Sequence, residues 1–210
     1  MARRTKEEAL ATRDLILDTA ERVFQRRGVS RTSLQEIAQQ AGLTRGAIYW
    51  HFQNKADVFD AMLQRVTLPM VAKLNGQSKC GLQDPLQHLR QNIVEVFHQI
   101  VHNLQVRRVF DIASHQVEYA DELQAVRDRH ISGRAEHVAD LERMLAQAVA
   151  CGQLAAGTPT RGAAEGLHAL LDGLMSNWLL DPKAFDLEVV GAQALDAYLA
   201  GLALPRAART

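Results

Sequence analysis

The side chains with the clearest chemical role lie between residues 44 and 55, where polar and aromatic residues take the outward positions of a short helical pattern. Arg45 is the natural base reader, because its planar guanidinium can hydrogen-bond O6 and N7 of guanine together. If this helix enters a major groove, its N-terminal residues meet base edges, and neighbouring polar groups reach phosphates. The predicted DNA-binding residues are Ser33, Thr44, Arg45, Gly46, Ala47, Tyr49, Trp50, His51 and Lys55.

Two short helical patterns on either side of a glycine must hold these side chains in place. Ser33 can cap the first pattern, and Glu36 would complete a Ser-x-x-Glu capping box that satisfies two backbone amides. Gly42 ends this helix, because glycine adopts the left-handed conformation that a Cβ resists. Thr44 can cap the second helix. The inward positions are Leu34, Ile37, Ala38, Ala41, Ala47, Ile48 and Phe52. This pattern is typical of a DNA-reading helix-turn-helix.

A helix before this motif completes a small predicted core. Thr12 can cap it and Gly28 ends it. Arg3, Arg4 and Lys6 precede it as a flexible basic arm, which is either a solvated terminus or an arm that touches phosphates or a minor groove. The expected core residues are Leu15, Ile16, Phe24, Leu34, Ile37, Ile48 and Phe52.

A fourth helix follows the motif, with Asn54 as its expected cap. We expect it to continue beyond residue 66, until Pro69 kinks or ends it. Its start would touch the DNA-binding segment and its end would enter the rest of the chain. A shift of this helix could therefore move the DNA-reading residues.

Residues 12–66 resemble the DNA-binding domain of the TetR family, and MARRTKEEA, TRGAIYWHF and NKADVF resemble its AcrR-type multidrug-efflux branch. Beyond about residue 70 the resemblance depends on RRVFDIASHQVEYADEL, on LDGLMSNWLLDP and on the order of the helices. The resemblance implies an all-helical dimer in which ligand binding to the C-terminal domain releases the operator.

Charge is unevenly distributed, although the 210 residues carry a formal net charge of zero. Residues 1–66 contain 11 Lys and Arg against 8 Asp and Glu, whereas residues 67–210 contain 13 against 16. The excess of positive charge thus lies with the predicted DNA-reading motif. Without a secretory signal or an uninterrupted apolar span, we expect a cytoplasmic protein. In that compartment Cys80 and Cys151 would be reduced thiols.

The remainder of the chain predicts a second helical domain. Residues 75–84 form a loop, and Asp84 followed by Pro85 is a strong helix start. Further helices are predicted over about 85–103, 105–117, 121–151, 161–180 and 187–203. We therefore predict an all-α protein of about nine helices. Residues 1–66 would form a three-helix helix-turn-helix DNA-binding domain with its basic arm, and residues 67–210 a ligand-binding and dimerisation domain.

The last two predicted helices are apolar on more than one face, and such helices must be covered on both sides. The residues concerned are Ala163, Ala164, Leu167, Leu170, Leu171, Leu174, Val189, Val190, Ala194, Leu195, Tyr198 and Leu199. A second copy of the same pair would give a two-fold, four-helix interface. A purely intramolecular core is the alternative.

Polar side chains within the apolar helices of the second domain indicate a cavity for a small apolar ligand. By resemblance to efflux regulators, Phe110, Ser114, His115, Asp172, Met175 and Trp178 match pocket-lining positions, and Val96, Phe97 and Leu171 could form its walls. Phe110 replaces a polar residue of many relatives, which suggests a smaller or more apolar pocket. For the apolar members, core packing is an equal alternative. Asp172 would face the ligand, an internal donor or the dimer partner.

Other chemistry has weaker support in the sequence. His98 and His102 would share a helix face, as metal-binding histidines can, but no Cys or carboxylate at a third position completes a site. Asp111 and His115 could form a dyad, although this spacing is common in helices without chemistry. The phosphate-loop, Gly-x-Ser-x-Gly, His-Glu-x-x-His and Cys-x-x-Cys motifs are absent. We therefore expect no catalytic residue, metal or cofactor.

Together these features predict a ligand-responsive transcriptional repressor that binds a palindromic operator as a dimer and is released by hydrophobic, drug-like inducers. Its partners would be double-stranded operator DNA, a small hydrophobic inducer such as an antibiotic, dye or plant phenolic, and a second copy held through the last two helices, with no membrane contact. The resemblance implies control of a multidrug efflux operon. The alternatives are a TetR-type regulator of a metabolic operon that responds to a metabolite, an architectural DNA-binding protein, or a helical enzyme or metal-binding protein.

Overall fold

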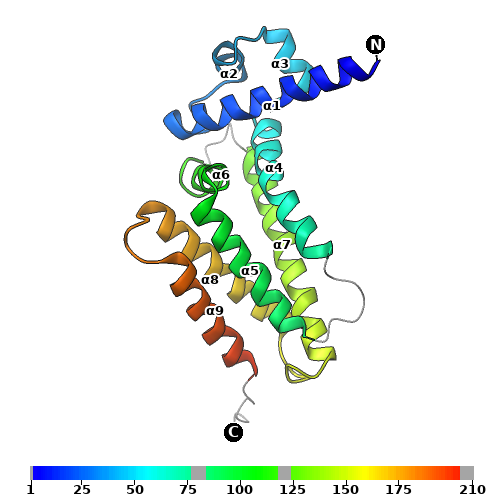
Figure 1. The fold of residues 1–210 in the computed structure, drawn as a ribbon, viewed down its shortest axis with the longest axis vertical. Coiled ribbons are helices and arrows are strands. Elements are labelled where there is room, and N and C mark those ends of the chain that lie inside the picture. The colour runs from blue at the N-terminus through cyan, green and yellow to red at the C-terminus, as the bar shows by residue number, and fades with distance from the viewer. Residues whose placement is uncertain (1, 77–83, 118–123, 204–210) are drawn as a thin grey trace. The chain divides into compact units, whose positions relative to one another are not determined.

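The computed structural model describes residues 2–76, 84–117 and 124–203, and all regular elements within those ranges are α-helices (Figure 1). In chain order they are α1 (Ala2–Arg27), α2 (Leu34–Gln40), α3 (Arg45–His51), α4 (Lys55–Gly76), α5 (Pro85–His102), α6 (Leu104–His115), α7 (Gln124–Ala150), α8 (Thr160–Leu180) and α9 (Leu187–Ala203). The predicted all-α fold is confirmed. Most of the predicted loop over 75–84, including Cys80, lies outside the described residues.

The chain divides into two compact units that are discontinuous in sequence. Unit 1 contains Met1–Pro69 and Arg108–His130, and unit 2 contains Met70–Arg107 and Ile131–Thr210. Helices α4, α6 and α7 each contribute residues to both units. The predicted domain boundary lay between residues 66 and 67 and did not include the return of Arg108–His130 to unit 1. Helical periodicity locates a helix without indicating what it packs against.

Several predicted helix starts are visible as side-chain caps. Asn54 Oδ1 accepts a hydrogen bond from the backbone N–H of Asp57 at 3.0 Å. Asp84 Oδ1 accepts from the N–H of Gln87 at 2.8 Å, with Pro85 in the first turn of α5. Asp186 Oδ1 accepts from Val189 N–H at 3.0 Å at the start of α9. Each cap satisfies one of the amides that lack a partner in the first helical turn.

Two expectations about the N-terminal helices were wrong. Helix α1 begins at Ala2, so Arg3, Arg4 and Lys6 belong to a helix and do not form a flexible arm. Thr12 lies inside this helix and does not cap it, since its hydroxyl donates to the carbonyl of Glu8 one turn earlier at 2.8 Å. The run of good helix formers before Thr12 favours this extension.

Helix α4 continues beyond residue 66 and is not ended by Pro69. Pro69 lies inside the helix, which runs on to Gly76. Proline removes one backbone donor without preventing the following residues from forming their own helical hydrogen bonds. The prediction that this helix continues beyond residue 66 is confirmed.

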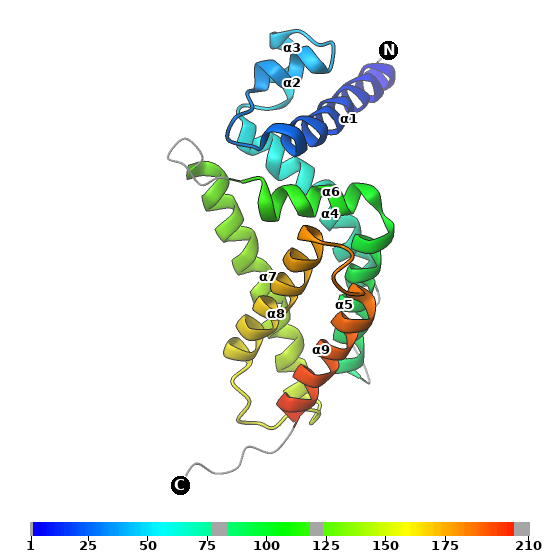
Figure 2. The ribbon, with the colours of Figure 1, turned by 90° about the vertical axis from the view of Figure 1, so that its left-hand side faces the viewer.

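The core of unit 1 lies between α1 and the three following helices (Figure 2). Its fully or almost fully buried side chains include Ile16, Leu17, Phe24, Ile37, Ile48, Phe52, Phe59 and Met62. Leu15 was expected in this core but is 42% exposed, while the neighbouring Leu17 is completely buried. The buried face of α1 therefore includes Leu17 in place of the predicted Leu15, whereas Ile16 and Phe24 are buried as expected.

In unit 2, α9 packs against both α5 and α8 (Figures 1 and 2). Gly191 permits the approach of α9 to α5. A Cβ added there would lie 2.6 Å from Cε2 and 2.8 Å from Cδ2 of Phe97, a side chain that is itself completely buried. The aromatic ring of Phe97 thus occupies the space that another residue type at position 191 would need.

We expect Gly191→Ala to lower the free energy of unfolding by about 1–3 kcal/mol, the usual cost of overpacking a dense core. Chemical denaturation followed by circular dichroism would measure this cost. Gly133→Ala on α7 is the matched control, because nothing lies within 4 Å of its added Cβ. That variant should be unchanged or slightly more stable. If Gly191→Ala were as stable as the wild type, the close packing of Phe97 against Gly191 would be contradicted.

Candidate nucleic-acid interface

The turn between α2 and α3 has the caps expected of a helix-turn-helix. Ser33 Oγ accepts from the N–H of Glu36 at 3.2 Å, and Thr44 Oγ1 accepts from the N–H of Ala47 at 3.2 Å. Gly42 has a φ of +69°, which allows the chain to reverse after α2. The inward side chain of α3, Ile48, is completely buried. The caps, the turn at Gly42 and the burial of Ile48 together determine which face of α3 is exposed to solvent.

That outer face carries the residues predicted to read DNA. Thr44, Arg45 and Gly46 are exposed, and the small side chain of Ala47 is half-buried. Tyr49 is 45% exposed and Trp50 is 74% exposed. The guanidinium carbon of Arg45 lies 5.4 Å from the centroid of the Tyr49 ring, within the range of a cation–π contact. Large aromatic rings held in water on a short helix favour a surface that another molecule covers.

His51, the last residue of α3, is less exposed than Tyr49 and Trp50, and this burial affects its protonation. It is half-buried, and its ring lies edge-on to Trp50 with centroids 4.6 Å apart. Burial lowers the pKa of His51, and the positive charge of Arg13 lowers it further. The imidazole is thus mainly neutral at pH 7. A phosphate contact by His51 would therefore use a neutral N–H donor.

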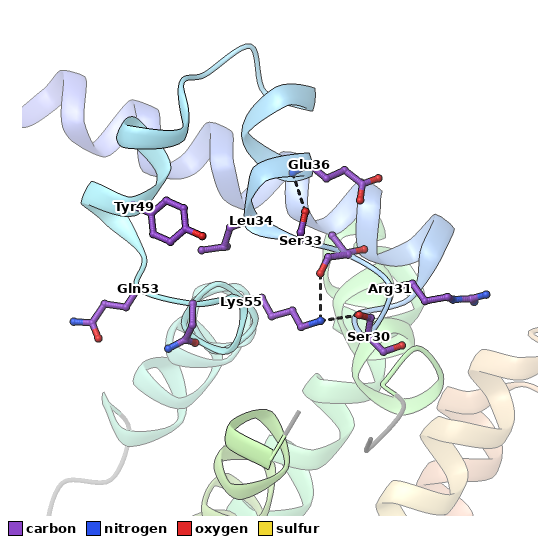
Figure 3. Close-up of a pocket in the computed structure, with 10 residues that line it drawn as sticks. Ser30, Arg31, Ser33, Leu34, Glu36, Tyr49, Gln53 and Lys55 are labelled. Carbon is purple, nitrogen blue, oxygen red and sulfur yellow. Dashed lines mark hydrogen bonds between the residues drawn. The ribbon is translucent and has the colours of Figure 1, made fainter. Parts of the chain in front are cut away.

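Lys55 was predicted to contact a phosphate, which stays a prediction, and in the structure its ammonium group donates hydrogen bonds within unit 1. Lys55 Nζ donates to the backbone carbonyls of Ser30 at 2.7 Å and Thr32 at 3.2 Å (Figure 3). These bonds join the first residue of α4 to the segment that leads into Ser33. Figure 3 shows the Lys55 side chain directed toward that segment at the edge of an open depression beside Tyr49. Lys55 thus positions the N-terminus of α2.

We expect Lys55→Met to lower the free energy of unfolding by about 2 kcal/mol, because two charge-assisted hydrogen bonds to part-buried carbonyls are lost. The salt dependence of DNA binding separates this role from a phosphate contact. Loss of a phosphate contact lowers the slope of log K against log salt by about 1, whereas a positioning residue leaves the slope unchanged. A lower slope with unchanged stability would show that Lys55 contacts a phosphate and does not position α2.

Only half of the predicted capping box of α2 is present. Ser33 caps the helix, but the carboxylate of Glu36 forms an ion pair with Arg27 at the end of α1. The guanidinium is a stronger partner for a carboxylate than a neutral backbone N–H. Glu36 therefore joins α1 to α2, a contact that sequence spacing could not indicate.

A buried carboxylate in α1 connects three helices of unit 1. Glu21 is 2% exposed, and its carboxylate forms an ion pair with Arg65 of α4. Its second oxygen lies 3.7 Å from Nη1 of Arg108 in α6. Asp18, one turn earlier, also contacts Arg65, at 2.8 Å. Sequence reasoning missed this cluster, since its members are 44 and 87 positions from Glu21 and no local motif links them.

The nine residues predicted to bind a ligand are distributed over both units. Phe110, Ser114 and His115 belong to unit 1, and the other six belong to unit 2. Phe97, Leu171 and Trp178 are buried, Val96, Phe110, His115 and Met175 are half-buried, and Ser114 and Asp172 are exposed. An exposed Asp172 does not incur the desolvation cost that its apolar neighbours suggested. The assignment of these residues to a ligand pocket stays a prediction.

Three of these residues have visible structural partners. Phe97 fills the space against Gly191, as described above. Trp178 lies beneath the guanidinium of Arg107, whose carbon is 5.0 Å from the indole centroid. His115 Nδ1 lies 3.0 Å from Oδ1 of Asp111, the predicted helical pair. A ligand that contacts Phe97 or Trp178 would therefore meet side chains that already stabilise unit 2.

A capped helix-turn-helix with an exposed arginine and aromatic face defines a DNA-binding regulator. Residues 16–62 match the bacterial regulatory proteins of the tetR family, and residues 84–204 match the C-terminal region of MAATS-type transcriptional repressors. The chain belongs to the TetR family of transcriptional regulators. Within the described residues, no helix combines the length and apolar character needed to cross a membrane.

Similar proteins cover almost the whole chain. The probable HTH-type transcriptional regulator ArpR of Pseudomonas putida is 41% identical over 189 residues, 89% of each chain. The crystal structure of NalD, the secondary repressor of the MexAB-OprM multidrug efflux pump in Pseudomonas aeruginosa, has a TM-score of 0.82 and 36% identity, covering 93% of this chain and 98% of NalD. SmeT of Stenotrophomonas maltophilia, in complex with triclosan, also has a TM-score of 0.82, with 34% identity over 91% of each chain. These similarities confirm the predicted family and fold.

Proposed function

We propose that the protein represses a multidrug efflux operon and that a small hydrophobic compound releases it from its operator. The observation that carries the DNA-binding part is the exposed face of α3, where Arg45, Tyr49 and Trp50 project from a helix fixed by the Thr44 cap and buried Ile48. Support for efflux control comes from NalD and SmeT, both named as repressors of multidrug efflux pumps.

The proposed dimer uses α8 and α9, so that two copies of α3 can face two half-sites of a palindrome. The two acidic residues of α9 are engaged with α5: Glu188 with two histidines, and Asp196 with Arg90. Apart from Gln193 and Asp196, the exposed positions of α9 carry small or apolar side chains, namely Val189, Ala197, Ala200, Gly201 and Ala203. Small side chains allow close approach of a second α9, and their burial supplies the driving force for association.

The proposed inducer is small and hydrophobic, as triclosan is in its complex with SmeT. Met175 and the predicted apolar lining residues of unit 2 would contact it, and a few polar groups would orient it. Release requires that the compound bind more tightly to a conformation with low operator affinity than to the DNA-bound one. A compound with equal affinity for both conformations would have no effect on repression.

A direct test starts from the complex of the full-length protein with fluorescently labelled DNA from upstream of its own gene. Triclosan, an antibiotic, a dye and a plant phenolic are each added while anisotropy is recorded. At least one compound should release the DNA in a saturable manner. Release would be measured as a lowering of operator affinity by roughly 5- to 150-fold, the usual range of allosteric coupling.

Two variants connect that release to the predicted ligand-binding residues. Met175→Ala and Asp172→Ala should change the half-maximal compound concentration while leaving operator affinity unchanged. Asp140→Ala, at an exposed ion pair on α7, is the control. Unchanged dose-response curves in both variants would remove these residues from the site. DNA release by a polar metabolite and by none of the hydrophobic compounds would replace efflux control with metabolic regulation.

A further inference from the structure

A cluster of two histidines and a glutamate lies on unit 2, outside the DNA-binding face. His98 and His102 are on successive turns of α5, with ring centroids 4.3 Å apart. Glu188, in the first turn of α9, lies against both rings. One nitrogen from each histidine and one carboxylate oxygen all lie within 4.8 Å of one another. The structure therefore supplies the third side chain that was missing from the histidine pair in the sequence.

The donor atoms of the cluster are close to one another, although each histidine contacts a different oxygen of Glu188. His98 Nδ1 lies 2.8 Å from Glu188 Oε1, and His102 Nε2 lies 3.0 Å from Glu188 Oε2. In a tetrahedral zinc site with bonds of about 2.0–2.1 Å, neighbouring ligand atoms are about 3.3 Å apart. Binding of an ion would replace the hydrogen bonds between the imidazoles and the carboxylate, and the three donor atoms, which lie within 4.8 Å of one another, would move to about this spacing.

The helices that carry these side chains are fixed close together by other contacts. Phe97, next to His98, packs against Gly191, which lies one turn after Glu188. Further along the same pair of helices, Arg90 of α5 forms two hydrogen bonds with the carboxylate of Asp196 of α9. The backbone positions of the three cluster residues are therefore set by packing, which reduces the entropy lost when an ion binds.

The three side chains of the cluster are partly exposed, so an ion bound to them would keep one coordination position open to solvent. The side chains of His98 and His102 are 49% and 55% exposed, and that of Glu188 is 35% exposed. Solvent can therefore reach the ion and provide a fourth ligand. Two imidazoles and one carboxylate form a donor set that zinc commonly uses, whereas magnesium and calcium prefer oxygen ligands alone.

We propose that His98, His102 and Glu188 bind a borderline divalent transition-metal ion, with Zn²⁺ as its representative. The ion would connect the end of α5 to the start of α9. Because such binding requires the folded arrangement of both helices, it stabilises the folded chain, and the stabilisation grows with the logarithm of the metal concentration once that concentration exceeds the dissociation constant.

The test uses the full-length protein without an affinity tag, and Zn²⁺ is presented in competition with a chromophoric chelator. The wild-type chain should take up one Zn²⁺ per chain, and its thermal unfolding temperature should rise with Zn²⁺. His102→Asn and Glu188→Gln should each weaken binding by at least about 100-fold, because loss of an outer partner alone costs 10- to 100-fold. Both changes are at solvent-accessible side chains, and circular dichroism without metal would verify folding.

His130→Gln, a change at another exposed histidine, is the matched control and should bind Zn²⁺ as the wild type does. Binding that survives in His102→Asn and Glu188→Gln would overturn the proposal. So would failure of the wild-type chain to take Zn²⁺ from the chelator. Loss of binding in Cys151→Ser would place the ion at the exposed thiol and would overturn it as well.

Discussion

Replacing Arg45 with alanine is expected to lower discrimination for one base pair in each half-site by about 1–3 kcal/mol, or roughly 5- to 150-fold. Arg45 is exposed at the first turn of α3, and its guanidinium is held near the ring of Tyr49. A planar group fixed in this way can donate two parallel hydrogen bonds to a guanine, and alanine can donate none. With two half-sites in one operator, the losses should be roughly additive.

Anisotropy titrations with the operator and with operators altered at single base pairs would measure this change. Arg45→Lys is the matched control, since lysine keeps the positive charge but lacks the two-pronged donor. It should retain most non-specific affinity while losing the discrimination. If Arg45→Ala instead weakens operator and unrelated DNA equally, Arg45 contacts phosphate and another residue reads the bases.

The Glu21→Ala variant is expected to lose about 3 kcal/mol of unfolding free energy, because removal of one member of a buried ion pair leaves the other charge without its partner. Glu21 is almost fully buried and contacts Arg65 and Arg108 from two other helices. The remaining contact of Arg65 with Asp18, at 2.8 Å, keeps the loss below the upper end of the usual range. The cost should be smaller in Glu21→Gln, which preserves shape and hydrogen bonding.

Urea denaturation followed by circular dichroism would determine the stability of these variants. Asp14→Ala is the control, because Asp14 also faces Arg65, at 4.0 Å, but its side chain is 62% exposed. An exposed pair of this kind contributes at most about 1 kcal/mol. Comparable losses for Glu21→Ala and Asp14→Ala would mean that the burial of Glu21 does not determine the strength of the cluster.

Features that depend on neighbouring residues in the chain could be predicted from the sequence. Ser33, Thr44 and Asn54 cap their helices as expected, because a cap needs only a side-chain oxygen and an amide two or three positions later. The exposed face of α3 followed from helical periodicity, since burying Ile48 and Phe52 leaves Arg45 and Trp50 in solvent. Local rules were therefore sufficient for the geometry of the DNA-reading helix.

Features that depend on partners from distant helices could not be predicted in this way. Lys55 was expected at a phosphate, but the carbonyls that it binds are 23 and 25 positions earlier. Glu188 completes a cluster with histidines that are 90 and 86 positions away. A charged side chain has no preferred partner in the sequence, and its role becomes fixed only when helices pack.

We propose that the outer face of α3 recognises a specific DNA sequence. The most direct measurement is the affinity of the full-length protein for DNA from upstream of its own gene, compared with a scrambled duplex of the same composition at one salt concentration. We expect an affinity ratio of at least about 10³ in favour of the upstream DNA, with two chains bound per palindrome. Equal affinity for the two duplexes would contradict sequence recognition by α3.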